Sequence, residues 1–338
     1  MRDAIAKSVW HGDGFGAIAA RAALTPLEWI YGAASAVVGA QRARQAGASL
    51  APTVSIGNIT VGGTGKTPMS AWVAAELRTR GLKPTLLLRG YGDDEELVHA
   101  MLNPGVPVVV DADRRRGAAA AVANGATALV LDDGFQHRQM PRDADLVLVS
   151  ADQWHDGPVR LLPAGPFREP LFALRRASLV VVTRKLASAE RAGRVVAAVR
   201  QAAAGCQTAV VHLAPRGLCA WGGGEAPLTD LNGQRVLAVS GIGAPDAFVG
   251  QLQALGAAVE VLSFGDHHAY SAADIDRIRR RAAPHDRVLC TLKDAVKIGP
   301  QWRADQPPLW YLSQFLEIEA GAAELRTLLD HVASLRSR

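Results

Sequence analysis

Short apolar runs alternate with helix-like segments along most of the chain after residue 52. Valine, leucine and isoleucine fill the runs without alternating polar residues, which is typical of strands covered by helices on both faces of a sheet. Strands separated by helical segments, such as those at residues 66–80 and 113–123, predict parallel β-α-β units. We therefore expect an α/β fold with a mostly parallel sheet sandwiched between helices. The runs occupy residues 53–56, 84–88, 106–110, 128–131, 146–149, 179–182 and 209–213.

A glycine-rich interval interrupts this alternation at residues 218–232, where Gly222-Gly223-Gly224 and Pro227 are typical of a loop or linker. Beyond it the alternation resumes, and we expect a second, smaller α/β domain. The apolar runs of this domain are residues 236–239, 259–262, 288–291 and 309–312. The predicted organisation is an N-terminal helical segment 1–45, a main domain 46–217, a linker 218–232, a smaller domain 233–310 and a segment 311–338 that could pack back on the main domain.

The N-terminal segment contains a charge-free apolar stretch at residues 29–41. This stretch is shorter than the roughly 20 residues that a membrane-spanning helix needs. Residues 15–38 suit a helix that lies in a membrane interface, or equally a helix that packs in the protein core. A signal peptide is a third alternative, although Asp3, Asp13 and Glu28 precede the stretch. The basic residues that would approach acidic headgroups are Lys7, Arg21, Arg42 and Arg44.

Composition limits the class of protein. A chain of 338 residues with 49% hydrophobic and 20% charged residues is long enough for about two folded domains and is unlike a disordered chain. Its three cysteines form no CxxC pair, which argues against a disulfide framework or a cysteine zinc site and favours a reducing compartment. The net charge of +5 suits anionic partners. Aromatic residues make up only 5%, with no basic stripe interleaved among them, so we expect no nucleic-acid partner.

A glycine-rich loop carries the strongest chemical signal. It lies between the apolar run 53–56 and the helical segment 66–80, as a P-loop does. Backbone N–H groups of such a loop and the N-terminus of the helix bind phosphate, Lys66 reaches the β and γ phosphates, and Thr67 ligates magnesium. The strict pattern requires glycine where this chain has Thr60, so the loop is a variant. The expected nucleotide-binding residues are Gly62, Gly63, Thr64, Gly65, Lys66 and Thr67.

Two adjacent carboxylates, Asp132 and Asp133, follow the apolar run 128–131. An acid at the end of a strand beside a P-loop holds magnesium directly or through water. Gln136 and His137 come next and add polar groups at the carboxyl end of the predicted sheet, where open α/β folds bind ligands. We therefore predict that Thr67, Asp132 and Asp133 hold Mg²⁺.

Seven motifs in series resemble the tetraacyldisaccharide 4'-kinase (lipid A 4'-kinase) family, and the resemblance covers nearly the whole chain. The motifs are Gly57-Asn58 with Gly62-Gly63-Thr64-Gly65-Lys66-Thr67-Pro68; Arg89-Gly90-Tyr91-Gly92; Asp132-Asp133-Gly134-Phe135-Gln136-His137; Leu162-Pro163-Ala164-Gly165-Pro166-Phe167-Arg168-Glu169-Pro170; Gly241-Ile242-Gly243-Ala244-Pro245; Asp266-His267-His268; and Lys293-Asp294-Ala295-Val296-Lys297.

The resemblance implies that the protein, with Mg²⁺, transfers the γ-phosphoryl group of ATP to the 4'-hydroxyl of tetraacyldisaccharide 1-phosphate, the lipid A precursor. It implies a peripheral enzyme at the cytoplasmic face of the inner membrane. By resemblance Asp94 is the base, with Asp93 as the alternative, and His267 assists it. The motif proline after the acids is Glu96 here, and Leu292 stands where the family usually has glutamate. The resemblance implies that Arg114, Arg168 and Glu169 bind substrate. The full set of expected substrate-binding residues is Arg89, Arg114, Gln136, His137, Arg168 and Glu169.

Other nucleotide-dependent functions share part of this pattern. A P-loop switch or assembly ATPase also has the strand, loop and helix of residues 53–80, so the loop alone leaves that alternative open. A nicotinamide enzyme fits less well, because the Gly241-Ile242-Gly243 segment lacks the third glycine of the dinucleotide fingerprint.

Overall fold

The computed structural model describes residues 2–90, 94–243, 245–303 and 306–335, without the side chains of residues 2–5 and 7. The chain forms two compact units. Unit 1 comprises Met1–Arg89, Gly105–Val211 and Ile318–Arg338, and unit 2 comprises Gly90–Pro104 and His212–Glu317. This division differs from the expected boundaries, since residues 90–104 group with unit 2 and the expected linker 218–232 lies inside unit 2.

Unit 1 is built on a parallel sheet with the strand order β6-β5-β1-β4-β2-β3. Strands β1, β2 and β4 are buried along their whole length, which explains their continuous apolar sequences. The predicted α/β fold class with a mostly parallel sheet is confirmed. The strands are β1 (Thr53–Asn58), β2 (Pro84–Leu88), β3 (Val108–Val110), β4 (Ala128–Asp132), β5 (Ala144–Ser150) and β6 (Leu179–Arg184).

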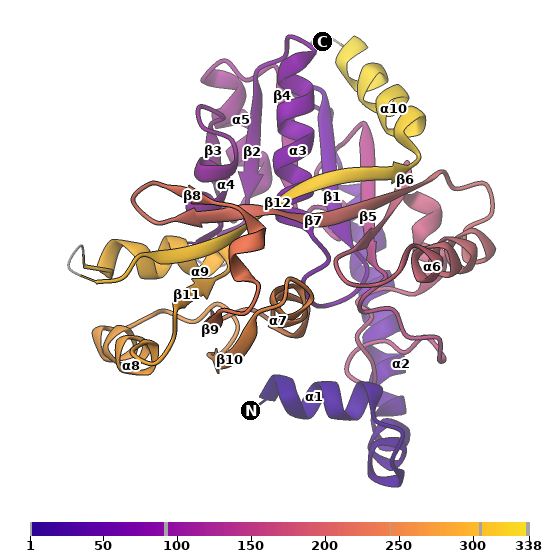
Figure 1. Ribbon diagram of the computed structural model, residues 1–338. Helices are drawn as coiled ribbons and strands as arrows, with labels where there is room; N and C mark the ends of the chain where they lie inside the picture. The colour runs from indigo at the N-terminus through magenta and orange to yellow at the C-terminus, as the bar shows by residue number, and fades with distance from the viewer. Residues whose placement is uncertain (1, 91–93, 244, 304–305, 336–338) are drawn as a thin grey trace. The chain divides into compact units, whose positions relative to one another are not determined.

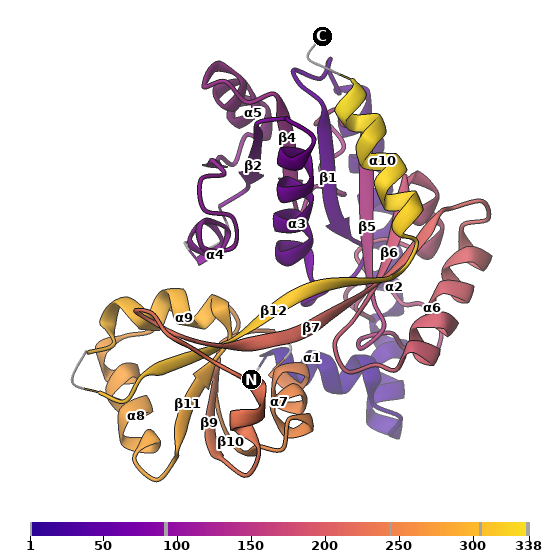
Figure 2. The same cartoon turned by 45° about the horizontal axis from the view of Figure 1, so that its top comes forward.

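Helix α3 (Lys66–Thr79) follows the glycine-rich loop and packs against β1, β2 and β4, as Figure 2 shows. Helix α10 (Ala322–Ser334) lies beside α3. Asp113 caps α5 by accepting hydrogen bonds from two backbone N–H groups of its first turn, and Ser188 caps α6 in the same way with one. The remaining helical elements that follow the sheet strands are α5 (Arg114–Ala123), η1 (Leu171–Arg176) and α6 (Ala189–Ala202).

Two helices precede the sheet, α1 (Arg2–His11) and α2 (Phe15–Arg44) (Figure 1). One face of α2 contacts the loop of residues 160–168. The buried Glu28 carboxylate accepts hydrogen bonds from Arg160 Nη1 at 2.8 Å and from the Leu161 backbone N at 2.7 Å. Tyr31 Oη donates to the Arg168 carbonyl oxygen at 3.2 Å. Among the described residues, no helix combines the length and apolar character needed to cross a membrane.

Unit 2 contains strands in the order β10-β9-β11-β12-β7, and β8 pairs antiparallel with β7. Helix α7 packs on β10, and α4 packs against α9 (Figure 1). Strands β7 (Thr208–Ala220) and β12 (Leu309–Ala320) each continue from one unit into the other. The other elements are α4 (Asp94–Leu102), β8 (Glu225–Ala226), η2 (Leu228–Leu231), β9 (Arg235–Ser240), α7 (Pro245–Ala254), β10 (Ala258–Ser263), α8 (Ala272–Ala282), β11 (Arg287–Cys290), α9 (Leu292–Ile298) and η3 (Gly299–Gln301).

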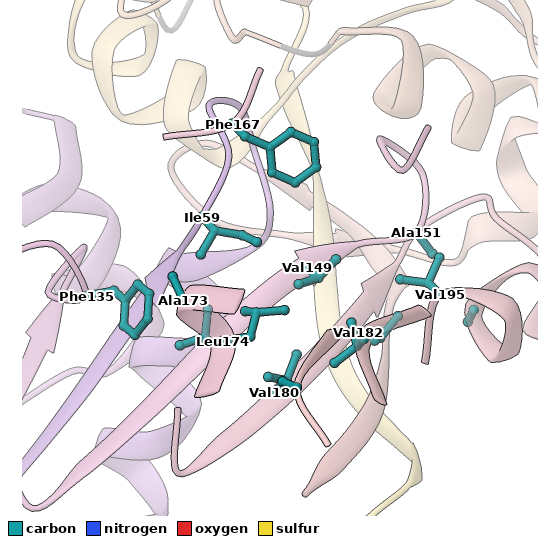
Figure 3. Packing of buried hydrophobic residues seen from close by; sticks show 14 residues of the cluster. Ile59, Phe135, Val149, Ala151, Phe167, Ala173, Leu174, Val180, Val182 and Val195 are labelled. Atoms are coloured by element: carbon teal, nitrogen blue, oxygen red, sulfur yellow. The ribbon is translucent and has the colours of Figure 1, made fainter. Parts of the chain in front are cut away.

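A core cluster of unit 1 joins the sheet to three loops (Figure 3). Ile59 comes from the start of the glycine-rich loop, Phe135 from the segment after β4, and Phe167 from the loop before η1. All three side chains are buried among residues of β5, β6 and α6. Burial of large apolar side chains stabilises by about 1.5–3 kcal/mol each, so this cluster gives loops without regular hydrogen bonding a fixed position.

Gly57 and Phe135 are in close backbone contact beneath these loops. A Cβ built on Gly57 would lie 2.4 Å from Phe135 Cβ and 2.7 Å from its backbone N. We expect Gly57→Ala to lower the free energy of unfolding by about 1–3 kcal/mol, because the backbone must shift to relieve the overlap. Urea unfolding of Gly63→Ala provides the control, since its Cβ would meet nothing within 4 Å. Equal stability of the two variants would contradict the prediction.

Candidate active site

The glycine-rich loop connects the end of β1 to the start of α3. Gly62 and Gly65 have φ values of 107° and 89°, a left-handed conformation that glycine adopts without steric cost. Asn58 Nδ2 donates to the hydroxyl of the buried Thr64 at 3.1 Å, and Thr183 Oγ1 donates to the Thr64 carbonyl at 2.9 Å. These bonds fix the loop from β1 and β6, so Lys66 and Thr67 stand at the N-terminus of α3.

The predicted acids lie at the end of β4, which pairs with β1. Asp132 is the last residue of the strand and is buried. Asp133 follows with a φ of 52° and is partly exposed. Its carboxylate lies 3.6 Å from Lys66 Nζ and 3.2 Å from Arg168 Nη1. The structure therefore brings together the loop lysine, an acid of the Asp-Asp pair and the arginine of the motif around residue 168.

A second set of polar contacts joins the same three loops. Gln136 Nε2 donates to the Asn58 carbonyl at 2.8 Å and to Glu169 Oε1 at 3.1 Å. Arg176 Nη1 pairs with the other Glu169 oxygen at 2.8 Å. The Arg168 backbone N donates to the Ile59 carbonyl at 2.7 Å. The loop that contains Arg168 and Glu169 is thus bonded both to the glycine-rich loop and to the segment after β4.

Arginines surround His137, which is half-buried. Burial, together with the positive charges of Arg114, Arg42, Arg142 and Arg89, lowers the pKa of His137 to about 4. The imidazole is therefore neutral at pH 7, able both to donate and to accept a hydrogen bond. Arg114 is itself buried, and its guanidinium donates to the Leu87 and Asp132 carbonyl oxygens, which ties the ends of β2 and β4 together. Arg89 is exposed just after β2.

Asp94 and His267 belong to unit 2, and the structure brings them together. Asp94 opens α4 and is 3% exposed, and its Oδ1 lies 3.4 Å from His267 Nδ1. His267 has a φ of 53°. Asp133 and His267 are the two non-glycine residues with positive φ in the described parts of the chain, and residues held in such sparsely populated conformations cluster at active sites. The alternative base Asp93 lies outside the described residues.

Some residues of this geometry have no clear signal in the sequence. Arg176 stands in an unremarkable Arg-Arg pair, yet it pairs with Glu169. Thr183 is the residue before the last one of β6, and its contact with Thr64 depends on strand order. Lys297, whose Nζ lies 3.6 Å from Asp94 Oδ2, falls within a motif that carried the family resemblance but had no assigned role.

A buried parallel strand, a glycine-rich loop that opens a helix at Lys66-Thr67, and acids at the end of the neighbouring strand define a nucleotide-binding α/β protein of the P-loop type. The chain belongs to the tetraacyldisaccharide-1-P 4'-kinase family, whose model matches residues 20–334. The predicted resemblance is confirmed, and it favours a kinase over the switch or assembly ATPase that the loop alone left open.

Curated relatives are similar over most of their length. A tetraacyldisaccharide 4'-kinase of Syntrophus aciditrophicus is 37% identical over 79% of this chain and 79% of its own. One from Halorhodospira halophila is 37% identical over 88% of this chain and 89% of its own. Among solved structures, the LpxK of Aquifex aeolicus in complex with ATP is similar with a TM-score of 0.71 and 26% identity, covering 92% of this chain and 99% of that one.

The lowered pKa of His137 predicts how stability depends on pH. The unfolded chain binds a proton at this histidine near pH 6.5, whereas the folded protein binds it only near pH 4. The unfolded state therefore binds more protons between these values, and stability falls as the pH is lowered through them. When the pH is lowered from 7 to 4.5, the free energy of unfolding measured with urea should fall more for the native protein than for the His137→Gln variant. The exposed His331 of α10 is the control, and a His331→Gln variant with the same effect would contradict the prediction.

Proposed function

We propose that this chain transfers the γ-phosphoryl group of ATP to the 4'-hydroxyl of tetraacyldisaccharide 1-phosphate. The observation that carries the proposal is membership of a 4'-kinase family over residues 20–334, with a glycine-rich loop that leads into Lys66 and Thr67 at the start of α3. In the reaction the acceptor O–H bond breaks as the oxygen forms a bond to the γ-phosphorus, and the bond from that phosphorus to ADP breaks.

The nucleotide phosphates would bind the backbone N–H groups of the loop from Gly62 to Gly65 and the N-terminus of α3. Lys66 provides a positive charge there, and its contact with Asp133 keeps it at the carboxyl end of the sheet. Similarity to an ATP-bound LpxK supports ATP as the nucleotide. Charge neutralisation and positioning supply most of the rate in phosphoryl transfer, so these groups matter more than any covalent chemistry of the protein.

Mg²⁺ fits the donor set at this edge of the sheet. The Thr67 hydroxyl and the Asp132 and Asp133 carboxylates are hard oxygen ligands, which magnesium prefers. Thr67 and Asp132 are buried in unit 1, one on the first turn of α3 and the other at the end of β4. When bound, the ion would neutralise phosphate charge. Asp133 also contacts Lys66 and Arg168, so it would share its charge among these partners.

Asp94 would act as the general base and accept the proton of the acceptor hydroxyl. Positioned acid-base groups of this kind contribute about 100- to 10,000-fold to a rate. The close approach of His267 Nδ1 to Asp94 Oδ1 supports a role for His267 in orienting the carboxylate. We assign Arg168, Glu169, Gln136 and neutral His137 to the acceptor, because these polar groups border the loop and a sugar phosphate needs both cations and hydrogen-bond partners. Arg89 and Arg114 would add positive charge beside them.

The kinase assay measures label transfer from γ-labelled ATP to tetraacyldisaccharide 1-phosphate in detergent micelles. Lys66→Ala and Asp94→Asn should each lower the rate by about 100-fold or more, and Asp94→Asn should retain nucleotide binding. The matched control is Asp276→Asn, which removes an exposed carboxylate of α8 in the same unit as Asp94. If label appears only as free phosphate whatever lipid is offered, the chain is a nucleotide switch. Activity of Asp94→Asn within threefold of the native rate would exclude Asp94 as base.

Helix α2 supports a peripheral position on the inner membrane, at the cytoplasmic face where ATP is present. One side of the helix packs on the protein through Glu28 and Tyr31, and the other side exposes large apolar residues. Phe15 is 87% exposed and Trp29 is 72% exposed. At about 100° per residue, Phe15, Ile18, Trp29, Ile30 and Val37 lie along one side of the helix, which suits burial in a membrane interface. The exposed apolar residues are Phe15, Ile18, Leu27, Trp29, Ile30, Val37 and Val38.

Sedimentation with vesicles of phosphatidylcholine and phosphatidylglycerol tests this surface. The double variant Trp29→Glu with Ile30→Glu should bind about tenfold more weakly or worse, since two exposed apolar side chains no longer enter the interface. The control is Phe172→Glu, because Phe172 is also exposed in unit 1 but lies on η1. Unchanged binding by the double variant, or an equal loss in Phe172→Glu, would place the membrane contact elsewhere.

A further inference from the structure

Helix α9 carries the Lys-Asp-Ala-Val-Lys motif, and both of its lysines face acids on the first turn of α4. Lys297 Nζ lies 3.6 Å from Asp94 Oδ2, and Lys293 Nζ lies 3.6 Å from Glu95 Oε1. The distances are equal but the surroundings differ. The side chains of Lys297 and Asp94 are 15% and 3% exposed, whereas those of Lys293 and Glu95 are 31% and 26% exposed. The inner pair therefore interacts with less screening by water than the outer pair.

The aspartate of the motif holds α9 in place. Asp294 is completely buried and accepts hydrogen bonds from Tyr270 Oη at 2.9 Å, the Gly241 backbone N at 3.0 Å and Thr291 Oγ1 at 2.7 Å. Lys297 lies one turn further along, with Nζ 5.6 Å from the centre of the Tyr270 ring. Because Asp294 fixes the helix from three directions, the ammonium group of Lys297 is delivered to one location.

The Asp94–Lys297 contact is an ion pair without a hydrogen bond. Among the described residues, Asp94 Oδ2 and Lys297 Nζ are both buried atoms with no hydrogen-bond partner. Removing a carboxylate charge from water is costly unless an opposite charge stands nearby. The Lys297 ammonium group, 3.6 Å from Asp94 Oδ2, supplies that charge without a hydrogen bond.

We propose that Lys297 is a positioning residue that holds the Asp94 carboxylate as the anion, the form that can accept the proton of the acceptor hydroxyl. The proposal rests on the proposed function of Asp94 as base. The proton passes from the acceptor oxygen to the Asp94 carboxylate as the new oxygen–phosphorus bond forms and the bond from that phosphorus to ADP breaks. Lys297 acts through the base and does not contact the reacting atoms. Asp94 also has other charged or titratable neighbours on the elements packed around it, namely His267 in its loop, Lys293 on α9, Asp294 and Tyr270 behind Lys297, and Glu95, Glu96 and His99 on α4.

The test compares Lys297→Met and Lys297→Arg with Lys293→Met in the full-length protein, using the lipid phosphorylation assay. Lys297→Met should lower kcat about 10- to 100-fold with KM for ATP and lipid within about twofold of the native values. The acidic limb of its kcat/KM profile should move to higher pH, because the ionised base loses its cation. Lys297→Arg should restore most of the activity and the native profile. Lys293→Met should change neither.

The double variant Lys297→Met with Asp94→Asn separates this role from general support of the fold. We expect it to be no slower than Asp94→Asn alone, since a cation that serves only the base has no further effect once the base is gone. If thermal unfolding shows that Lys297→Met is not folded, Lys297→Gln, which retains a polar end without the charge, replaces it in every comparison.

Three results would overturn the proposal: effects of Lys297→Met and Asp94→Asn that multiply, a Lys297→Met variant that behaves like Lys293→Met, or a Lys297→Arg variant as impaired as Lys297→Met. Full activity of Asp94→Asn would instead refute the base itself. An inactive Asp94→Asn beside an active Lys297→Met would refute the role of Lys297 alone.

Discussion

The apolar cluster that contains Ile59, Phe135 and Phe167 is the constraint on which the charged groups of unit 1 depend. Each residue anchors a different loop, and each loop carries charge or hydrogen-bonding groups that could not hold their own positions in water. Lys66, Asp133 and Arg168 meet because the three loops that carry them are joined underneath. Gly57 shows how tight this arrangement is, since even a methyl group there would collide with Phe135. The apolar packing of the loops therefore determines where their charged side chains lie.

Unit 2 positions its acid by a different means. The base candidate Asp94 stands at the N-terminus of α4, where the helix dipole favours a negative charge, and α9 brings a cation against it. A network of hydrogen bonds around Asp294 holds that cation in place rather than apolar packing alone. The carboxylate thus has the helix N-terminus and the Lys297 ammonium group as electrostatic partners, and the His267 imidazole lies beside its other oxygen.

Patterns of neighbouring residues predicted the elements that neighbouring residues form, such as strands and the glycine-rich loop. The run 84–88 coincides with β2, and the glycine-rich loop was located because its spacing is fixed by phosphate chemistry. Strands β7 and β12 extend beyond the predicted runs because their outer halves are only half-buried and contain polar residues. Helices α4 and α9 have 9 and 7 residues, too short for a periodic signal. Asp94 and His267 were paired only through family resemblance, since the sequence gives no distance between residues 173 positions apart. The same holds for Lys297, whose partner depends on how α4 packs.

Unit 2 is made of two separate segments of the chain, residues 90–104 and 212–317, and the first of them is flanked on both sides by residues of unit 1. This interleaving has a consequence for synthesis on the ribosome. Helix α4 emerges early, but its partner α9 follows about 200 positions later. A nascent chain already has every residue of the glycine-rich loop long before it has the lysine that faces Asp94. A chain that stops before α9 has the glycine-rich loop and Asp94 but lacks Lys297. Residues 212–317 alone have Lys297 but lack both the loop and Asp94. A prematurely terminated product therefore retains a phosphate-binding loop without the cation that faces the base.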